Sequence, residues 1–136
     1  MHADKDGRDR ILIIEDDRLS LKLYSDLILS RGYELLTAAD GATGLDLARK
    51  HQPDLVLSDV SLPELSGIEI CAALKSDERT RDIPVLILTA WPESEPAALA
   101  AGCDGFLVKP VPVSTLWHFV QALIGRHTTP QRGRSN

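Results

Sequence analysis

The sequence has 136 residues, a formal net charge of -5 and an ordinary share of hydrophobic and charged residues. The acidic balance disfavours general affinity for nucleic acids or anionic membranes, and no apolar stretch approaches the ~20 residues needed to span a bilayer. We expect a single domain with a sizeable core. Cys71 and Cys103 lack CxxC spacing and are predicted to be free thiols in a reducing cytoplasm.

Elements of two kinds alternate along the chain. Short runs rich in Ile, Leu and Val predict strands, most of them buried on both faces as in a parallel sheet, over residues 11–14, 34–39, 54–58, 83–88 and 106–108. Helical spacing of apolar residues predicts helices over residues 18–31, 41–51, 68–75 and 113–124, with a short one within 91–101. This order predicts an α/β doubly wound parallel sheet of five strands and five helices. The second strand is the least apolar and needs an edge, which favours the strand order 2-1-3-4-5.

Four of the predicted strands run into polar residues. In a parallel sheet the ligand site lies beyond the carboxyl ends of the strands, so these side chains should converge: Glu15, Asp16, Asp59, Thr89 and Lys109. Clustered carboxylates repel one another unless a cation lies among them, which points to Mg²⁺. A hydroxyl and an ammonium suit a phosphoryl group.

Asp59 stands alone after the central strand and is the best candidate for a nucleophile that forms an aspartyl-phosphate. The adjacent Glu15 and Asp16 are better suited to holding metal. Asp17 is predicted to cap the following helix rather than to bind the metal.

The chain resembles a receiver domain of two-component response regulators. The motifs that carry this resemblance are residues 11–17 (ILIIEDD), 58–63 (SDVSLP) with Ser66 and Gly67, 88–90 (LTA) and 105–110 (GFLVKP). Each motif is weak alone, but the four together, in order and suitably spaced, are specific. The resemblance implies a flavodoxin-like fold and covers most of the chain.

The resemblance also implies roles at the metal and at the acceptor. Asp59 would be the phosphoacceptor and would bind Mg²⁺, with Asp16 as a direct ligand. Glu15 would assist, usually through water, and Ser61 would contribute its backbone carbonyl.

Further roles concern the phosphoryl group. Thr89 and Lys109 would bind its oxygens, and Ala90 would contribute a backbone amide. Phe106, where the family more often has Tyr, would be the switch aromatic unless it is a plain core residue. The bond between Lys109 and Pro110 would be cis, an isomer that proline makes accessible.

The function implied is a cytoplasmic signalling switch rather than an enzyme, taking its phosphoryl group from a sensor histidine kinase or a histidine phosphotransfer protein. We expect a stand-alone receiver of the chemotaxis-regulator type at 9–125, between a flexible N-terminus (1–8) and a disordered tail (126–136). Its output would be a target protein or a homodimer, without direct contact to nucleic acid or membrane.

Two alternatives remain open from the residues. A pseudo-receiver would serve only as a protein-binding module. A Mg²⁺-dependent phosphohydrolase of the haloacid dehalogenase type would also use an aspartyl-phosphate, but its D-x-D motif is missing from Asp59-Val60-Ser61. A nucleotide-binding protein is disfavoured because no glycine-rich phosphate loop follows any strand.

The partner or dimer face is expected on the fourth helix, fifth strand and fifth helix. A stripe on the last helix should pack on the sheet, made of Leu116, Phe119 or Val120, and Leu123. Val113, Trp117 and Ile124 fall on a neighbouring stripe and would form an exposed apolar patch. The short helix beside it offers Ala97, Ala98 and Leu99 rather than charges. Trp91 is likewise expected to be partly exposed. The competing interpretation of Trp117 is a core residue.

Overall fold

The computed structural model describes the backbone of residues 8–132 and the side chains of residues 8–125. Its strands are β1 (Arg10–Ile14), β2 (Glu34–Ala38), β3 (Leu55–Ser58), β4 (Val85–Thr89) and β5 (Gly105–Val108). Its helices are α1 (Arg18–Ser30), α2 (Gly41–His51), α3 (Gly67–Lys75), α4 (Glu95–Ala100) and α5 (Val113–Arg132), with a 3-10 turn, η2 (Pro92–Ser94), before α4. Every predicted element is present, and most bounds differ from the prediction by one or two residues.

All strand pairs are parallel, and the sheet order is β2-β1-β3-β4-β5, as predicted. The central strands are buried along their whole length, whereas β2 at the edge is half-buried over most of its length and partly exposed. This difference follows from position, because an edge strand is covered by fewer neighbours.

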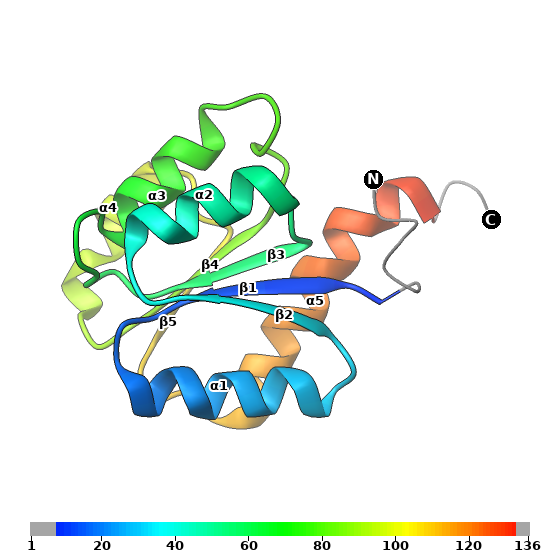
Figure 1. Cartoon of the computed structure of the whole chain (residues 1–136), viewed down its shortest axis with the longest axis horizontal. Coiled ribbons are helices and arrows are strands. Elements are labelled where there is room, and N and C mark those ends of the chain that lie inside the picture. Colours follow the sequence, from blue (N-terminus) through cyan, green and yellow to red (C-terminus); the bar gives the residue numbers. More distant parts are fainter. Residues whose placement is uncertain (1–7, 133–136) are drawn as a thin grey trace.

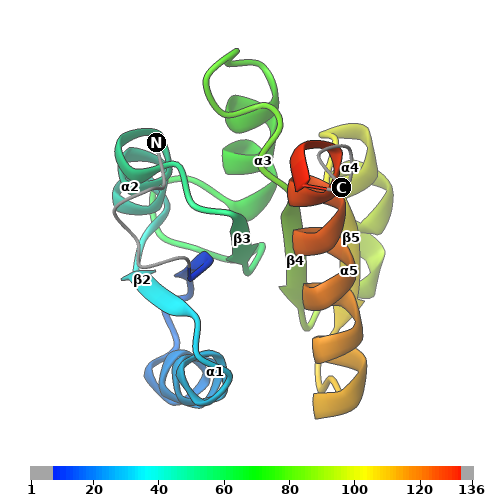
Figure 2. The ribbon, with the colours of Figure 1, turned by 90° about the vertical axis from the view of Figure 1, so that its right-hand side faces the viewer.

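Helices cover both faces of the sheet. In Figure 1, α1 lies on one side of the strands, and α2 and α3 lie on the other. Figure 2 shows α1 and α2 near the β2 edge and α4 and α5 near β5. Alternate side chains of the strands therefore enter two separate cores, one with α1 and α5 and the other with α2, α3 and α4.

The last helix is longer than predicted. α5 continues to Arg132, so residues 126–132 of the expected disordered tail are helical, while 133–136 lie outside the described residues. Once a helix is nucleated by packing, each added residue extends it at little cost. Residues 1–7 of the expected flexible N-terminus also lie outside the described residues.

The predicted exposure of Trp117 is wrong. Its side chain is only 4% exposed, Ile124 is only 5% exposed, and both belong to the core shared with α1. The ring of Tyr33 stacks on Trp117 at 6.2 Å between centroids, and the guanidinium of Arg31 lies 4.3 Å from the same ring. The inward face of α5 is therefore wider than one stripe, because it packs against the end of α1 as well as the sheet.

The other packing predictions for this region are confirmed in part. Leu116, Val120 and Leu123 are buried as expected, and Trp91 is 52% exposed. Val113 is exposed at the start of α5. Of the expected exposed patch, Val113 is therefore exposed, whereas Trp117 and Ile124 are buried.

Candidate functional site

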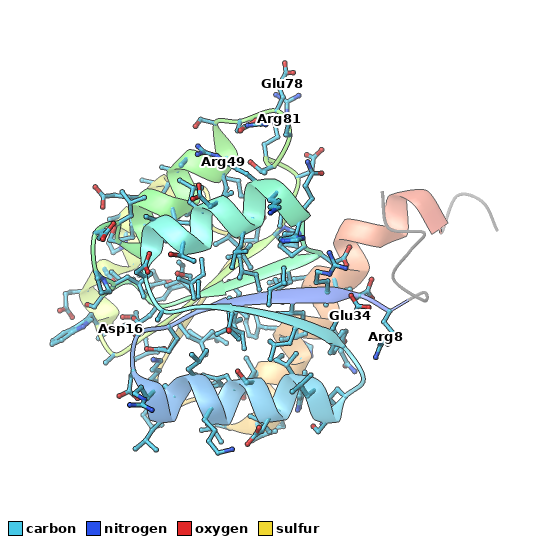
Figure 3. The ribbon with its side chains drawn as sticks, viewed as in Figure 1. Arg8, Asp16, Glu34, Arg49, Glu78 and Arg81 are labelled. Atoms are coloured by element: carbon cyan, nitrogen blue, oxygen red, sulfur yellow. The ribbon has the colours of Figure 1, made fainter. Side chains whose placement is uncertain are left out.

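The predicted site residues meet at the carboxyl ends of the strands. Ile14 pairs with Ser58 across β1 and β3, so the residues that follow them, Glu15 and Asp59, emerge side by side. The Asp59 amide donates to the Ile14 carbonyl at 3.1 Å. Figure 3 labels Asp16 at this end of the sheet and Arg8 and Glu34 at the opposite end.

Lys109 joins the two acidic strand ends. Its Nζ lies 2.8 Å from Glu15 Oε1 and 3.2 Å from Asp59 Oδ2. The Glu15 side chain is 4% exposed and those of Asp59 and Lys109 are 13% and 17% exposed, so water screens these contacts poorly. One ammonium thus balances two carboxylates at a largely buried point.

The charge of Lys109 is favoured by its surroundings. Burial acts to lower its pKa, but hydrogen bonding and Coulomb attraction from Glu15 and Asp59 outweigh burial and raise that pKa above its ordinary value. The lysine is therefore a fixed positive charge at neutral pH.

Asp59 is also held by the backbone of its own loop. Its Oδ1 accepts hydrogen bonds from the amides of Val60 (2.6 Å) and Ser61 (3.3 Å). The loop folds back so that Gly67 donates its amide to the Val60 carbonyl at 2.9 Å. A Cβ at Gly67 would overlap the Asp59 carbonyl oxygen, so this close approach requires glycine. Ser61 is exposed beside the acceptor.

The acidic run after β1 divides into three roles. Glu15 is buried and also accepts the Asp17 amide at 3.1 Å, whereas Asp16 is exposed. Asp17 is the N-cap of α1, as predicted, and accepts the Ser20 amide at 2.9 Å. That hydrogen bond lowers the pKa of Asp17.

Carboxylates near Lys109 are the candidate ligands for a metal ion. Within the part of the chain that the structure describes, no three His, Cys, Asp or Glu residues form a group arranged to hold a metal ion. Glu15 and Asp59 do share one cationic partner, and Asp16 adjoins Glu15 with an exposed side chain. The donor chemistry, carboxylate oxygens of the exposed Asp16 and of the largely buried Asp59, suits a hard divalent ion.

Three further predicted residues lie on β4 and β5. Thr89 is fully buried at the end of β4, and its Oγ1 accepts the Trp91 amide at 3.3 Å. Ala90 is exposed directly after it. Phe106 is half-buried and packs against the core formed with α2, α3 and α4.

The turn after β5 fixes the position of the Lys109 backbone. The Lys109 amide donates to the Thr89 carbonyl at 2.8 Å, which keeps the two strand ends together. The peptide bond between Lys109 and Pro110 is cis, as the resemblance implied.

Tyr24 is a residue of the site that the sequence-based prediction missed. It comes from α1, is 9% exposed, and lines a small hollow with Glu15, Ser58 and Asp59. Burial raises its pKa; nearby Lys109 opposes this, while Glu15 and Asp59 add to it. A signal was available, since Tyr24 is the only residue with a polar tip on the inward stripe of the helix that follows the acidic pair.

Comparison with known proteins identifies the family of the chain. A family model described as the response regulator receiver domain matches residues 11–121. The polar-differentiation response regulator DivK of Brucella ovis is 40% identical over 117 residues, which are 85% of this chain and 95% of that protein.

Solved structures show the same fold. The chemotaxis response regulator CheY4 of Vibrio cholerae is 32% identical with a TM-score of 0.80, covering 86% of this chain and 99% of its own. The receiver domain of sensor histidine kinase PA1611 from Pseudomonas aeruginosa, described with magnesium coordinated in its active-site cleft, is 28% identical with a TM-score of 0.81 and covers 88% and 99%.

Among the helices of the described residues, none has the length and apolar character needed to cross a membrane. The matched segment includes the five strands, apart from Arg10 at the start of β1, and every strand-end residue discussed above. The chain belongs to the response regulator receiver domain family, whose members act as signalling domains of two-component systems.

Proposed function

We propose that Asp59 accepts a phosphoryl group from a phosphohistidine, and that the chain works as a switch set by this modification. The donor would be a sensor histidine kinase or a histidine phosphotransfer protein in the cytoplasm. The observation that carries the proposal is the position of Lys109, whose ammonium contacts Asp59 at 3.2 Å and Glu15 at 2.8 Å in a poorly screened site. A lone carboxylate beside a fixed cation at a sheet's carboxyl edge suits phosphoryl chemistry.

In the proposed transfer, a carboxylate oxygen of Asp59 forms a bond to phosphorus while the bond from phosphorus to the histidine nitrogen breaks. Negative charge is spread over the phosphoryl oxygens, and the leaving imidazole nitrogen takes up a proton from solvent to give neutral histidine. In this proposal Lys109 balances charge on the phosphoryl group, and the Thr89 hydroxyl donates to one of its oxygens. The backbone amide of Ala90, an exposed residue directly after Thr89, is proposed as a further donor.

Mg²⁺ is proposed as the cofactor, held by Asp16, Asp59 and the Ser61 carbonyl, with Glu15 assisting. When bound, it would neutralise the clustered carboxylates and bind phosphoryl oxygens. The support in this chain is the donor set itself. The two inner carboxylates already share a cationic partner, and Asp16 is exposed next to them.

The test is phosphorylation with a small donor. The protein is incubated with Mg²⁺ and acetyl phosphate, and intact mass spectrometry counts added phosphoryl groups. We expect one group on the wild type and none on Asp59→Asn. Asp46→Asn, an exposed position on α2, serves as the matched control and should be labelled like the wild type.

Three results would contradict the proposal. Label retained by Asp59→Asn would place the acceptor elsewhere. A wild type that stays unlabelled with acetyl phosphate and with phosphohistidine donors would favour the pseudo-receiver alternative. Steady release of inorganic phosphate from phosphomonoesters would favour the phosphohydrolase.

An output face on α4, β5 and α5 is also proposed, in a smaller form than the sequence suggested. Each of these elements presents one exposed large hydrophobic residue: Leu99 (55%), Val108 (41%) and Val113 (48%). Exposed apolar groups that lie together favour contact with a protein partner. Sedimentation of the phosphorylated protein should show weaker association for Leu99→Ser than for the wild type, and equal association would contradict this face.

A further inference from the structure

The side chain of Tyr24 lines the same small hollow as Asp59, the proposed phosphoacceptor. The hollow that it shares with Asp59 and Glu15 is otherwise lined by Ser58 and apolar residues of the strands. Tyr24 also packs in the core formed with α1 and α5, so its ring is fixed on several sides. It is the contribution of α1 to a site otherwise built from strand ends.

The Lys109 ammonium has two charged partners and one uncharged partner, the ring of Tyr24. Its Nζ lies 5.8 Å from the centroid of the Tyr24 ring, in addition to its contacts with Glu15 and Asp59. A cation within about 6 Å of a ring face is attracted by the ring quadrupole, more strongly where water is excluded. The distance is close to the outer limit for such a contact, but the Lys109 side chain is only 17% exposed, so water weakens the attraction little.

We propose that Tyr24 is a positioning residue for Lys109, whose ring keeps the ammonium beside Asp59 while the acidic partners of the lysine change. This inference rests on the proposed phosphorylation of Asp59. Phosphorylation alters the charge and shape of one of the two carboxylates that hold the ammonium. The ring contact does not depend on either carboxylate, and its weak directionality tolerates a small shift of the ammonium toward phosphoryl oxygens.

The proposal assigns the effect to the ring face rather than to the hydroxyl. Phenylalanine keeps the face and removes only the hydroxyl, whereas leucine keeps apolar packing and removes the face. Tyr33 supplies a matched control, because it is another tyrosine packed against the same core but stacks on Trp117 instead of Lys109.

The experiment measures initial rates of phosphorylation of the full chain by acetyl phosphate with Mg²⁺, together with melting temperatures. We expect Tyr24→Phe to stay within about 2-fold of the wild type and Tyr24→Leu to be slower by about 3- to 10-fold, the range of one cation–π contact. Tyr33→Leu should melt at a lower temperature yet keep the wild-type rate.

A second measurement detects the contact between the ring and the ammonium in the wild type itself. The ε-methylene protons of Lys109 should show an upfield ring-current shift in the NMR spectrum of the wild type, before and after phosphorylation. Tyr24→Phe should keep the shift, and Tyr24→Leu should lose it.

Each remaining outcome overturns the inference. These are a wild-type rate in Tyr24→Leu, an equal loss in Tyr24→Phe and Tyr24→Leu, a comparable loss in Tyr33→Leu, or unshifted Lys109 protons in the wild type. Failure of the proposed function is distinct, because the wild type itself would then remain unlabelled.

Discussion

The Lys109 ammonium lies 2.8 Å from a carboxylate oxygen of Glu15, joining residues from opposite ends of the chain inside a poorly hydrated site. Glu15 has little contact with water and one other described donor, the Asp17 amide. The pair therefore affects stability as well as chemistry.

Lys109→Met should destabilise the fold by about 1–3 kcal/mol, because it leaves a buried carboxylate without its charged partner. Urea unfolding measures the change. The control is Lys22→Met, which breaks a 3.0 Å pair with Asp26 on the exposed side of α1 and should cost less than ~0.5 kcal/mol. Equal changes in the free energy of unfolding for the two substitutions would show that the buried pair stabilises the fold no more than the exposed pair.

Asp16→Ala should abolish the stabilising effect of Mg²⁺. An ion that binds only the folded chain stabilises it by an amount that grows with the logarithm of the ion concentration once that concentration exceeds the dissociation constant, and Asp16 is proposed as a direct ligand. Thermal melts in EDTA and in millimolar Mg²⁺ compare the wild type with this variant. Asp26→Ala, an exposed acid on α1 away from the strand ends, should respond to Mg²⁺ like the wild type. An Asp16→Ala protein with a full Mg²⁺ response would exclude that ligand.

Trp117→Ala should cost about 3–5 kcal/mol of stability, because a large buried side chain is removed from the core between α1 and α5. Trp91→Ala is the control, and should change the free energy of unfolding by less than ~0.5 kcal/mol because Trp91 is 52% exposed. Sedimentation of both variants tests association separately. Weaker association with an unchanged melt in Trp117→Ala would restore the partner interpretation.

The predicted convergence of strand-end residues depended on one geometric rule. Parallel strands bring their carboxyl ends to the same edge, so Glu15, Asp59, Thr89 and Lys109 could be placed together without knowing any distance. Strand order followed from the polarity of β2. These features are encoded locally, in runs of a few residues.

The features that were missed depend on contacts between distant segments. Trp117 is buried because Arg31 and Tyr33, which follow the end of α1, pack against it. The spacing of apolar residues within α5 gives no information about these contacts. Tyr24 was missed because its proximity to Lys109 depends on how α1 lies over the sheet. The rotation of a helix about its axis and its packing neighbours cannot be obtained from its own sequence.

Cys71 should be unreactive in the folded protein. Burial raises its pKa to about 12, with a smaller contribution from Cys103, and the nucleophilic thiolate is therefore scarce at neutral pH. The raised pKa favours the neutral thiol, so the associated stability is present below about pH 9 and is lost as the pH rises toward 12.

A thiol reagent at pH 8 tests this prediction in Cys103→Ser, which retains Cys71 alone. We expect slow reaction in buffer and fast reaction in concentrated urea. Cys71→Ser is the counterpart, and its half-buried Cys103 should react faster than Cys71 in buffer. Rapid modification of Cys71 in the folded state would show that the core around α3 opens readily.

Trp91 should report phosphorylation by its fluorescence. Its indole is exposed, and its backbone amide donates to Thr89 Oγ1 at 3.3 Å. If the Thr89 hydroxyl turns to a phosphoryl oxygen on Asp59, it gives up this bond, and the segment that begins η2 is released from the strand end. The environment of the exposed indole then changes, while Trp117 stays in its stacked position between Tyr33 and Arg31.

Emission spectra with and without acetyl phosphate and Mg²⁺ distinguish the two tryptophans. The change on phosphorylation should persist in Trp117→Phe and vanish in Trp91→Phe. Thr89→Val should still accept label on Asp59, more slowly, but with a smaller change in Trp91 emission, because valine cannot accept the amide or follow the phosphoryl group. A spectral change that follows Trp117 instead would mean that the response to phosphorylation passes through the α1–α5 core rather than through the segment after β4.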